Sequence, residues 1–208
     1  MLPRVLLLFA VSLSLTGCVD WVFGLSYDQT EAGKLEGKLV VEWVDQDKFL
    51  FIPDKEKPLV FRRKNGEVIQ PEQIFTDGGS VPQALRAVKS YSPWGYAPAF
   101  IVHDWLFVMK QCALPGHEKY NVDKAAIIMA EAMKTVMENP KYGGSNKLVH
   151  YSMYQAVRSP VAQDYWDNGK CETPTGRRDA KSMSIKTLRE VAPVDDSPPP
   201  RPRFEISF

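Results

Sequence analysis

The stretch "APAFIVHDWLFVMK", residues 97–110, decides the fold of this chain. Apolar side chains occupy nearly every side of the helix that it would form, a pattern typical of a helix buried on all faces. His103 and Asp104 are the polar exceptions at its centre. Buried polar groups need hydrogen-bond partners, so we expect this pair to contact side chains or turns from neighbouring elements.

The residues before this helix show the composition and spacing of β-strands. Three strands are predicted, at residues 38–44, 48–53 and 59–63, with turn signals at residues 45–47 and 64–67. The dipeptide Asn65-Gly66 favours a hairpin with a type I′ turn, because both residues tolerate positive φ.

The residues after the central helix have a helical pattern. Asn121 suits the N-cap of a helix over residues 121–137, and another helix is predicted at residues 146–158. One face of the first helix carries apolar residues, namely Val122, Ala125, Ile128, Met129 and Met133. Strands followed by helices indicate an α+β fold, with a small antiparallel sheet in the N-terminal half packed on a helical C-terminal half.

The segment "FTDGGSVPQAL", residues 75–85, connects the two halves. Ser80 and Gln83 have the spacing of a capping box, and Pro82 suits the first turn of a helix. These roles account for Ser80 and for the glycines. They explain Asp77 less fully, since an aspartate in a turn can be only a local acceptor.

The N-terminus resembles the signal peptide of a bacterial lipoprotein. Arg4 precedes the apolar run "VLLLFAVSLSL", which is too short to span a bilayer comfortably and suits the core of a signal peptide. The run ends in "LTGC", which resembles a lipobox. This resemblance implies cleavage before Cys18 and attachment of lipid, such as palmitate, to its thiol. The alternative is an ordinary secretory signal with a chance cysteine.

Lipidation would place the mature chain in the cell envelope. A second acyl chain is sufficient for stable membrane attachment. Val19, rather than aspartate, follows the cysteine. By analogy with lipoprotein sorting, this favours the outer membrane of a Gram-negative cell, with the chain facing the periplasm or the cell surface.

The charge of the chain argues against nucleic acid as a partner. The full sequence carries a formal net charge of +1, and removal of residues 1–17 takes away one cation, Arg4. A neutral chain without a segregated basic face lacks the electrostatic footprint of a nucleic-acid-binding protein. The basic cluster "FRRKNG", residues 61–66, is interpreted as a solvated hairpin tip.

Two cysteines, Cys112 and Cys171, remain once Cys18 is acylated. Disulfides persist in the envelope, and both cysteines lie in polar loops rather than in apolar elements. We therefore predict a Cys112–Cys171 disulfide that closes a long loop. Two free thiols are the alternative.

The predicted organisation has four parts. Residues 1–17 are the signal peptide, residues 18–33 a linker from the lipidated cysteine, and residues 34–171 a single α+β domain. Residues 172–208 hold six of the chain's 16 prolines and mixed charges. This composition is typical of a flexible tail.

The motifs in the domain resemble those of a phage-associated bacterial family, domain of unknown function 1353. In that family a TD-x-x-S-x-P segment precedes a helix with an adjacent His-Asp pair, a later aspartate and a final aromatic-rich helix. The matching elements here are "IFTDGGSVPQAL", "YAPAFIVHDWLF", Asp123, "YQAVR" and Trp166. This chain departs from the pattern at Gly79, where alanine is usual, and at Gln83, where arginine is common. The resemblance implies a fold and a phage or secreted context, but no reaction.

Two interpretations of the His-Asp pair remain open, together with a weaker third. The first is a polar network in which Asp104 accepts from the 76–80 turn and His103 donates to Asp77 or Asp123. The second is a divalent metal site for zinc or a similar ion, formed by Asp77, His103, Asp104 and Asp123. A third, Ser80 as a nucleophile beside His103, is weaker because its capping role already explains the serine.

The sequence therefore predicts an envelope-anchored, phage-related binding or interaction module, whose partner would be a protein or cell-wall material. The alternative is a metal-dependent hydrolase that uses a His-Asp-Asp site, for which the cell wall is a candidate substrate.

Overall fold

The stretch 97–110 forms the central helix of the computed structural model, α3 (Ala97–Gln111). From Ala97 to Phe107 every residue except Asp104 is buried, which confirms the prediction of a helix enclosed on nearly all sides. The structure describes residues 27–46, 48–77, 93–141, 144–174 and 202–208.

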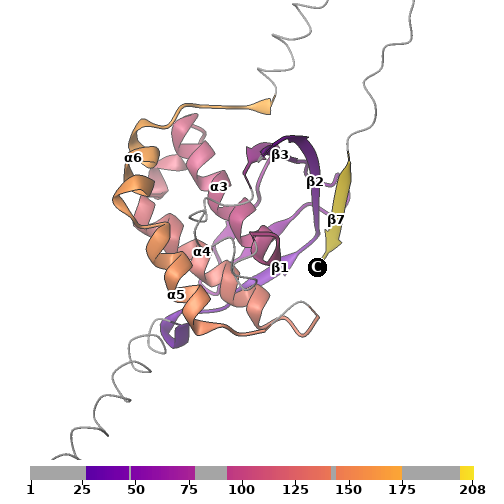
Figure 1. Cartoon of the computed structure of the whole chain (residues 1–208), viewed down its shortest axis with the longest axis vertical. Coiled ribbons are helices and arrows are strands. Elements are labelled where there is room, and N and C mark those ends of the chain that lie inside the picture. The colour runs from indigo at the N-terminus through magenta and orange to yellow at the C-terminus, as the bar shows by residue number, and fades with distance from the viewer. Residues whose placement is uncertain (1–26, 47, 78–92, 142–143, 175–201) are drawn as a thin grey trace, which may run out of the picture.

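Seven short strands form two antiparallel sheets in the described part of the chain. One sheet has the order β1 (Lys34–Glu36), β4 (Val60–Arg62) and β5 (Val68–Ile69). The other has the order β6 (Ile74–Thr76), β3 (Lys48–Phe51), β2 (Lys38–Asp45) and β7 (Arg203–Ser207). Figure 1 shows the strands gathered on one side of the molecule and the helices on the other. The predicted α+β fold is thus confirmed.

The β4–β5 connection is the predicted hairpin, but its turn is not type I′. Gly66 has a φ of +88°, whereas Asn65 does not have positive φ. A type I′ turn needs positive φ at both central residues. The backbone N–H of Gly66 donates to Arg63 O at 3.0 Å, and that of Arg63 donates to Glu67 O at 2.9 Å. The loop therefore has three residues, with glycine in the left-handed position after a type I turn.

Gly37 joins β1 of one sheet to β2 of the other. Its φ is +95°, and a Cβ atom at this position would collide with the carbonyl group of Pro58. The next residue, Lys38, donates its backbone N–H to Lys57 O at 2.9 Å. This close approach of two backbone segments requires glycine.

The helical half contains α4 (Val122–Met137), α5 (Lys147–Ala156) and α6 (Pro160–Asn168), with 3-10 turns η2 (Pro93–Tyr96) and η3 (His117–Lys119). The five apolar residues predicted to share one face of α4 are all buried. Each of the three α-helices begins at a side-chain N-cap, formed by Asn121, Asn146 and Ser159. The helices at residues 121–137 and 146–158 are confirmed, and α6 adds one more.

A largely buried ion pair ties the β4–β5 hairpin to α4. Arg63 donates to both carboxylate oxygens of Glu131, at 2.6 and 2.8 Å, and to Glu67 at 2.6 Å. The Arg63 side chain is only 10% exposed, whereas that of Arg62 is 50% exposed. The prediction of a solvated basic tip therefore fails for Arg63, because the acidic residue of α4 draws its guanidinium inward.

Two predicted boundaries need correction. Tyr27 lies in the predicted linker, yet its side chain is buried in the core, where its ring packs edge-on against His150. The C-terminal stretch was predicted to be a tail, yet residues 203–207 form β7 and pair with β2, from Lys38–Ser207 to Glu42–Arg203. Composition alone missed this strand because its partner lies far away in the sequence.

The predicted disulfide is present between Cys112, at the end of α3, and Cys171, after α6. Within the described residues, no helix has both the length and the apolar character needed to cross a membrane. The signal peptide, Cys18, the capping box at Ser80 and Gln83, and most of the predicted tail lie outside the described residues.

Candidate functional site

His103 lies in the middle of α3 and is 7% exposed. Its Nδ1 atom is 3.5 Å from Oδ1 of Asp104, which favours a proton on Nδ1 when the ring is neutral. The Nε2 atom is buried and has no hydrogen-bond partner among the residues that the structure describes.

Asp104 joins the sheet half of the molecule to the central helix. Its Oδ2 atom accepts a hydrogen bond of 2.7 Å from Oγ1 of Thr76, the last residue of β6. The predicted network had the 76–80 turn donate its backbone to Asp104. The observed donor is instead the Thr76 side chain from that segment, and the hydrogen bond still links the segment to α3.

Asp123 does not join the His103–Asp104 pair. Its side chain is 59% exposed at the start of α4 and accepts from Arg158 Nε at 2.8 Å. This hydrogen bond raises the pKa of the Arg158 guanidinium. Asp123 therefore connects α4 to the turn that follows α5, a structural role on the surface.

The predicted metal site of Asp77, His103, Asp104 and Asp123 is not formed by these side chains. Among the described residues, no group of three or more His, Cys, Asp or Glu side chains could hold a metal ion. Asp123 is bound to Arg158. His150, which could have supplied a second imidazole, is fully buried, with its Nε2 3.0 Å from Ala130 O. The sequence could not reveal these competing partners.

Asp77 follows directly after Thr76 at the end of β6 and is exposed. It makes interactions of its own and also affects the ionisation of Tyr165. Ser80 lies outside the described residues.

A series of aromatic rings leads from His103 to the surface. The His103 ring packs on Phe107 with centroids 4.8 Å apart, and Phe107 stacks on Tyr165 at 5.8 Å with an interplanar angle of 23°. Trp166 packs edge-on against the same Phe107 ring at 4.8 Å. The buried rings thus support Tyr165, which is 56% exposed.

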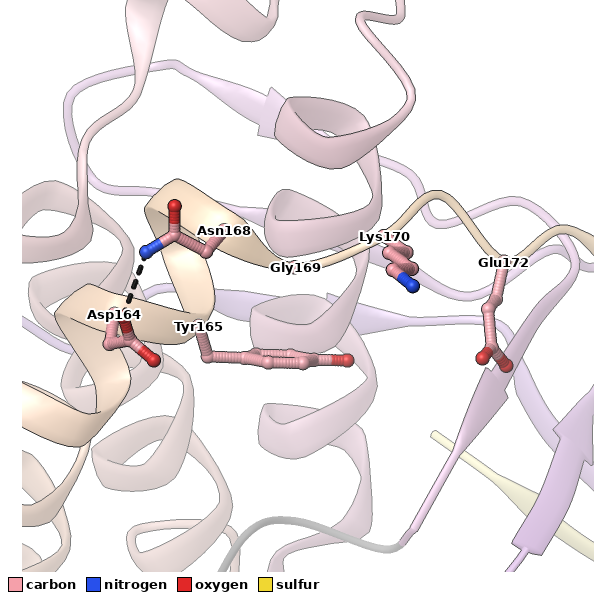
Figure 2. Close-up of a pocket in the computed structure, with 6 residues that line it drawn as sticks. All are labelled: Asp164, Tyr165, Asn168, Gly169, Lys170 and Glu172. Carbon is pink, nitrogen blue, oxygen red and sulfur yellow. Dashed lines mark hydrogen bonds between the residues drawn. The ribbon is translucent and has the colours of Figure 1, made fainter.

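Tyr165 lines a pocket of about 300 Å³ at the end of α6. In Figure 2 its ring extends from α6 below the segment 169–172, and the side chains of Lys170 and Glu172 descend on the same side as the ring. The lining residues are Asp164, Tyr165, Asn168, Gly169, Lys170 and Glu172. Small-molecule sites start at about this volume.

The surroundings of Tyr165 keep its hydroxyl protonated. Burial of part of the side chain raises its pKa, and the negative charges of Asp104, Glu172 and Asp77 raise it further. A hydrogen bond with the Gln111 side chain acts in the opposite direction. The Asp77 and Asp104 carboxylates predicted from the sequence therefore contribute to the electrostatic field of this pocket.

Covalent and polar contacts fix the wall of the pocket to α3. The Cys112–Cys171 disulfide anchors the segment that carries Lys170 and Glu172. Gln111 donates to Tyr165 O at 3.1 Å, and its amide group fills the space that a Cβ of residue 169 would need. Glu172 also pairs with Lys48 of β3 at 3.1 Å, so the wall reaches the sheet.

The sequence did not predict the pocket residues, although it drew attention to Trp166 and Cys171 in the same region. Residues from position 172 onward were assigned to the tail, so the contact between Glu172 and Lys48 was not anticipated. The sequence did contain a signal: Tyr165 lies among acidic, amide and basic residues, six positions before Cys171.

The fold and the site define a small α+β domain with a polar, aromatic-floored pocket beside a His-Asp pair of which the histidine is buried. Residues 55–157 match the model of the family DUF1353, described as a protein of unknown function. The chain thus carries a domain of unknown function, and the match supports the resemblance inferred from the motifs. The matched stretch includes His103 and Asp104 and ends before the pocket residues. Searches of curated proteins and of solved structures found no match to the chain.

Proposed function

We propose that this chain is a lipid-anchored binding module of the bacterial cell envelope, with the Tyr165 pocket as its binding site. The observation that carries the proposal is the pocket itself. The half-exposed Tyr165 ring packs there on buried aromatic rings and is surrounded by charged and amide side chains. Tyrosine gives a large contact area at low entropic cost, which suits binding surfaces. The partner would be cell-wall material or an envelope protein.

The proposed anchor is Cys18. The lipobox-like "LTGC" motif supports this modification, and Val19 supports the outer membrane as the destination. The disulfide is consistent with an oxidising compartment. The resemblance to a phage-associated family supports a prophage origin, in which the module would affect infection of its host.

Fractionation and binding measurements together test the proposal. In a Gram-negative host fed labelled palmitate, we expect the full-length chain to acquire label and to sediment with outer membranes. Cys18→Ser should lose both properties. Purified protein should bind isolated envelopes or cell-wall sacculi, and Tyr165→Ala should weaken that binding. A wild-type chain without label, or binding that ignores Tyr165, would contradict the corresponding part of the proposal.

The alternative function, a metal-dependent hydrolase, has less support. It requires several His and Asp side chains around one point, and the described residues do not provide such a group. His103 and Asp104 instead connect elements of the core. Release of soluble fragments from sacculi in the presence of zinc, lost in His103→Ala, would favour the hydrolase over the binding module.

A further inference from the structure

The lining of the Tyr165 pocket presents hydrogen-bonding groups of both charge signs. Asp164 accepts from Asn168 at 2.7 Å, Glu172 pairs with Lys48, and Lys170 is exposed. A compact anion in the pocket would face the Asp164 and Glu172 carboxylates and the negative field of Asp77 and Asp104, and a compact cation would have Lys170 in the same lining. A neutral ligand with several hydroxyl groups avoids both conflicts, because each hydroxyl both donates and accepts.

The floor of the pocket is an aromatic ring that packs on buried aromatic rings. Tyr165 rests on Phe107, and Phe107 in turn packs against Trp166. The exposed part of the Tyr165 ring can take a flat, weakly polar ligand surface without rearranging the core. The ligand should therefore combine an apolar face with a polar edge.

We infer that the pocket binds a neutral saccharide, with a pyranose ring stacked on Tyr165 and its hydroxyls paired with the side chains of Asp164, Asn168 and Lys170. A pyranose ring matches both requirements, since one face presents C–H groups and the rim presents hydroxyls. This inference rests on the proposed binding function and specifies its ligand class. Because Tyr165 is half-exposed, the pocket is open to solvent. It can therefore hold one sugar unit of a longer chain whose neighbouring units extend out of the pocket on both sides.

Ligand-observed NMR on the full chain tests the inference. The probes are chitotetraose with N-acetyl groups, maltotetraose and wall glycan strands freed of peptide, with trilysine and free stem peptide as comparisons. We expect at least one saccharide to bind and both peptides to fail. Tyr165→Ala should weaken saccharide binding by about tenfold or more, as loss of a central aromatic contact does. Tyr165→Trp should retain the binding.

Val161→Ala is the matched control, because Val161 lies on the same helix, is 78% exposed and does not line the pocket. This variant should bind as the wild type does, and circular dichroism should show that all variants are folded. Equal weakening by Val161→Ala and Tyr165→Ala would overturn the inference.

Sacculus binding separates failure of this inference from failure of the proposed function. Tyr165-dependent binding to intact sacculi without binding to any saccharide probe would overturn the ligand class and leave the binding function standing. Tyr165-dependent binding of stem peptide would do the same and identify a peptide site. Absence of binding to both sacculi and saccharides would overturn both.

Discussion

Arg62 and Arg63 are neighbours in the sequence, but their ion pairs differ in kind. Arg62 pairs with Glu36 at 2.9 Å on the surface, whereas Arg63 makes a bidentate ion pair with the largely buried Glu131. Hydrogen bonds with Glu131 and Glu67 raise the pKa of the Arg63 guanidinium, so it stays charged. Exposed pairs contribute little to stability, but removal of one partner of a buried pair leaves a charge without compensation.

Arg63→Gln should therefore destabilise the fold by about 3 kcal/mol, and Arg62→Gln by less than about 1 kcal/mol. Urea unfolding followed by circular dichroism measures both. The two substitutions are chemically identical and adjacent, so the difference reports burial. Similar midpoints for the two variants would contradict the assignment of Glu131 as a buried partner.

His150 should make stability fall on acidification. Burial, together with the nearby charge of Lys134, lowers its pKa below the ordinary value, while a hydrogen bond with Ala130 acts in the opposite direction. Below about pH 6.5 the unfolded chain binds a proton at this position that the folded chain does not yet bind. Protonation thus favours unfolding, and stability rises with pH through this range.

The test compares wild type with His150→Gln, which keeps a side-chain donor and does not titrate. Between about pH 7.5 and 5.5, the wild type should lose more stability in thermal unfolding than the variant does. His117→Gln is the control, since His117 lies at the start of η3 and its side chain is partly exposed. Parallel slopes for wild type and His150→Gln would exclude the buried histidine as the cause.

At the scale of elements, local sequence patterns predicted strands and helices well and predicted their partners poorly. The pattern of residues 97–110 and the cap at Asn121 place α3 and α4 because periodicity and capping are local properties. The partner of Asp123 is 35 residues away, and β7 pairs with a strand from the other end of the domain. Nothing local encodes such contacts, and so the sequence did not predict β7 or the contact between Asp123 and Arg158, whereas the α+β prediction succeeded.

Gly37 and Gly66 offer a matched test of how the strands are connected. Both have positive φ, but a Cβ at Gly66 meets nothing within 4 Å, whereas one at Gly37 meets the Pro58 carbonyl. Gly66→Ala should cost about 1–2 kcal/mol from backbone strain alone. Gly37→Ala should cost clearly more, because the backbone at Gly37 must also move away from the Pro58 carbonyl group. Chemical denaturation of both variants checks the order, and a smaller loss for Gly37→Ala would refute it.

At the scale of the whole molecule, the disulfide is the covalent link between the central helix and the pocket wall. Cys112 and Cys171 are separated by 59 positions in the sequence. Closing a loop of this length restricts the unfolded chain, which stabilises the folded state by about 2–4 kcal/mol. The same bond holds Lys170 and Glu172 near Tyr165.

Replacement of both cysteines by alanine should lower the midpoint of unfolding accordingly and also weaken Tyr165-dependent binding. Addition of a reductant to the wild type should reproduce both effects. The cysteine variant itself should not respond to reductant, which controls for other actions of the reagent. An unchanged midpoint after complete reduction would contradict a stabilising role for the bond.

β2 pairs with two strands that lie at very different distances from it in the sequence. Its partner β3 follows almost at once in the sequence, whereas β7 begins more than 150 residues later. Distant pairings form slowly compared with hairpins. During refolding, the edge of β2 that later pairs with β7 therefore exposes unpaired main-chain N–H and C=O groups. A strand from another molecule can pair with this edge before β7 does. The yield of correctly folded protein should therefore fall as the protein concentration during refolding is raised.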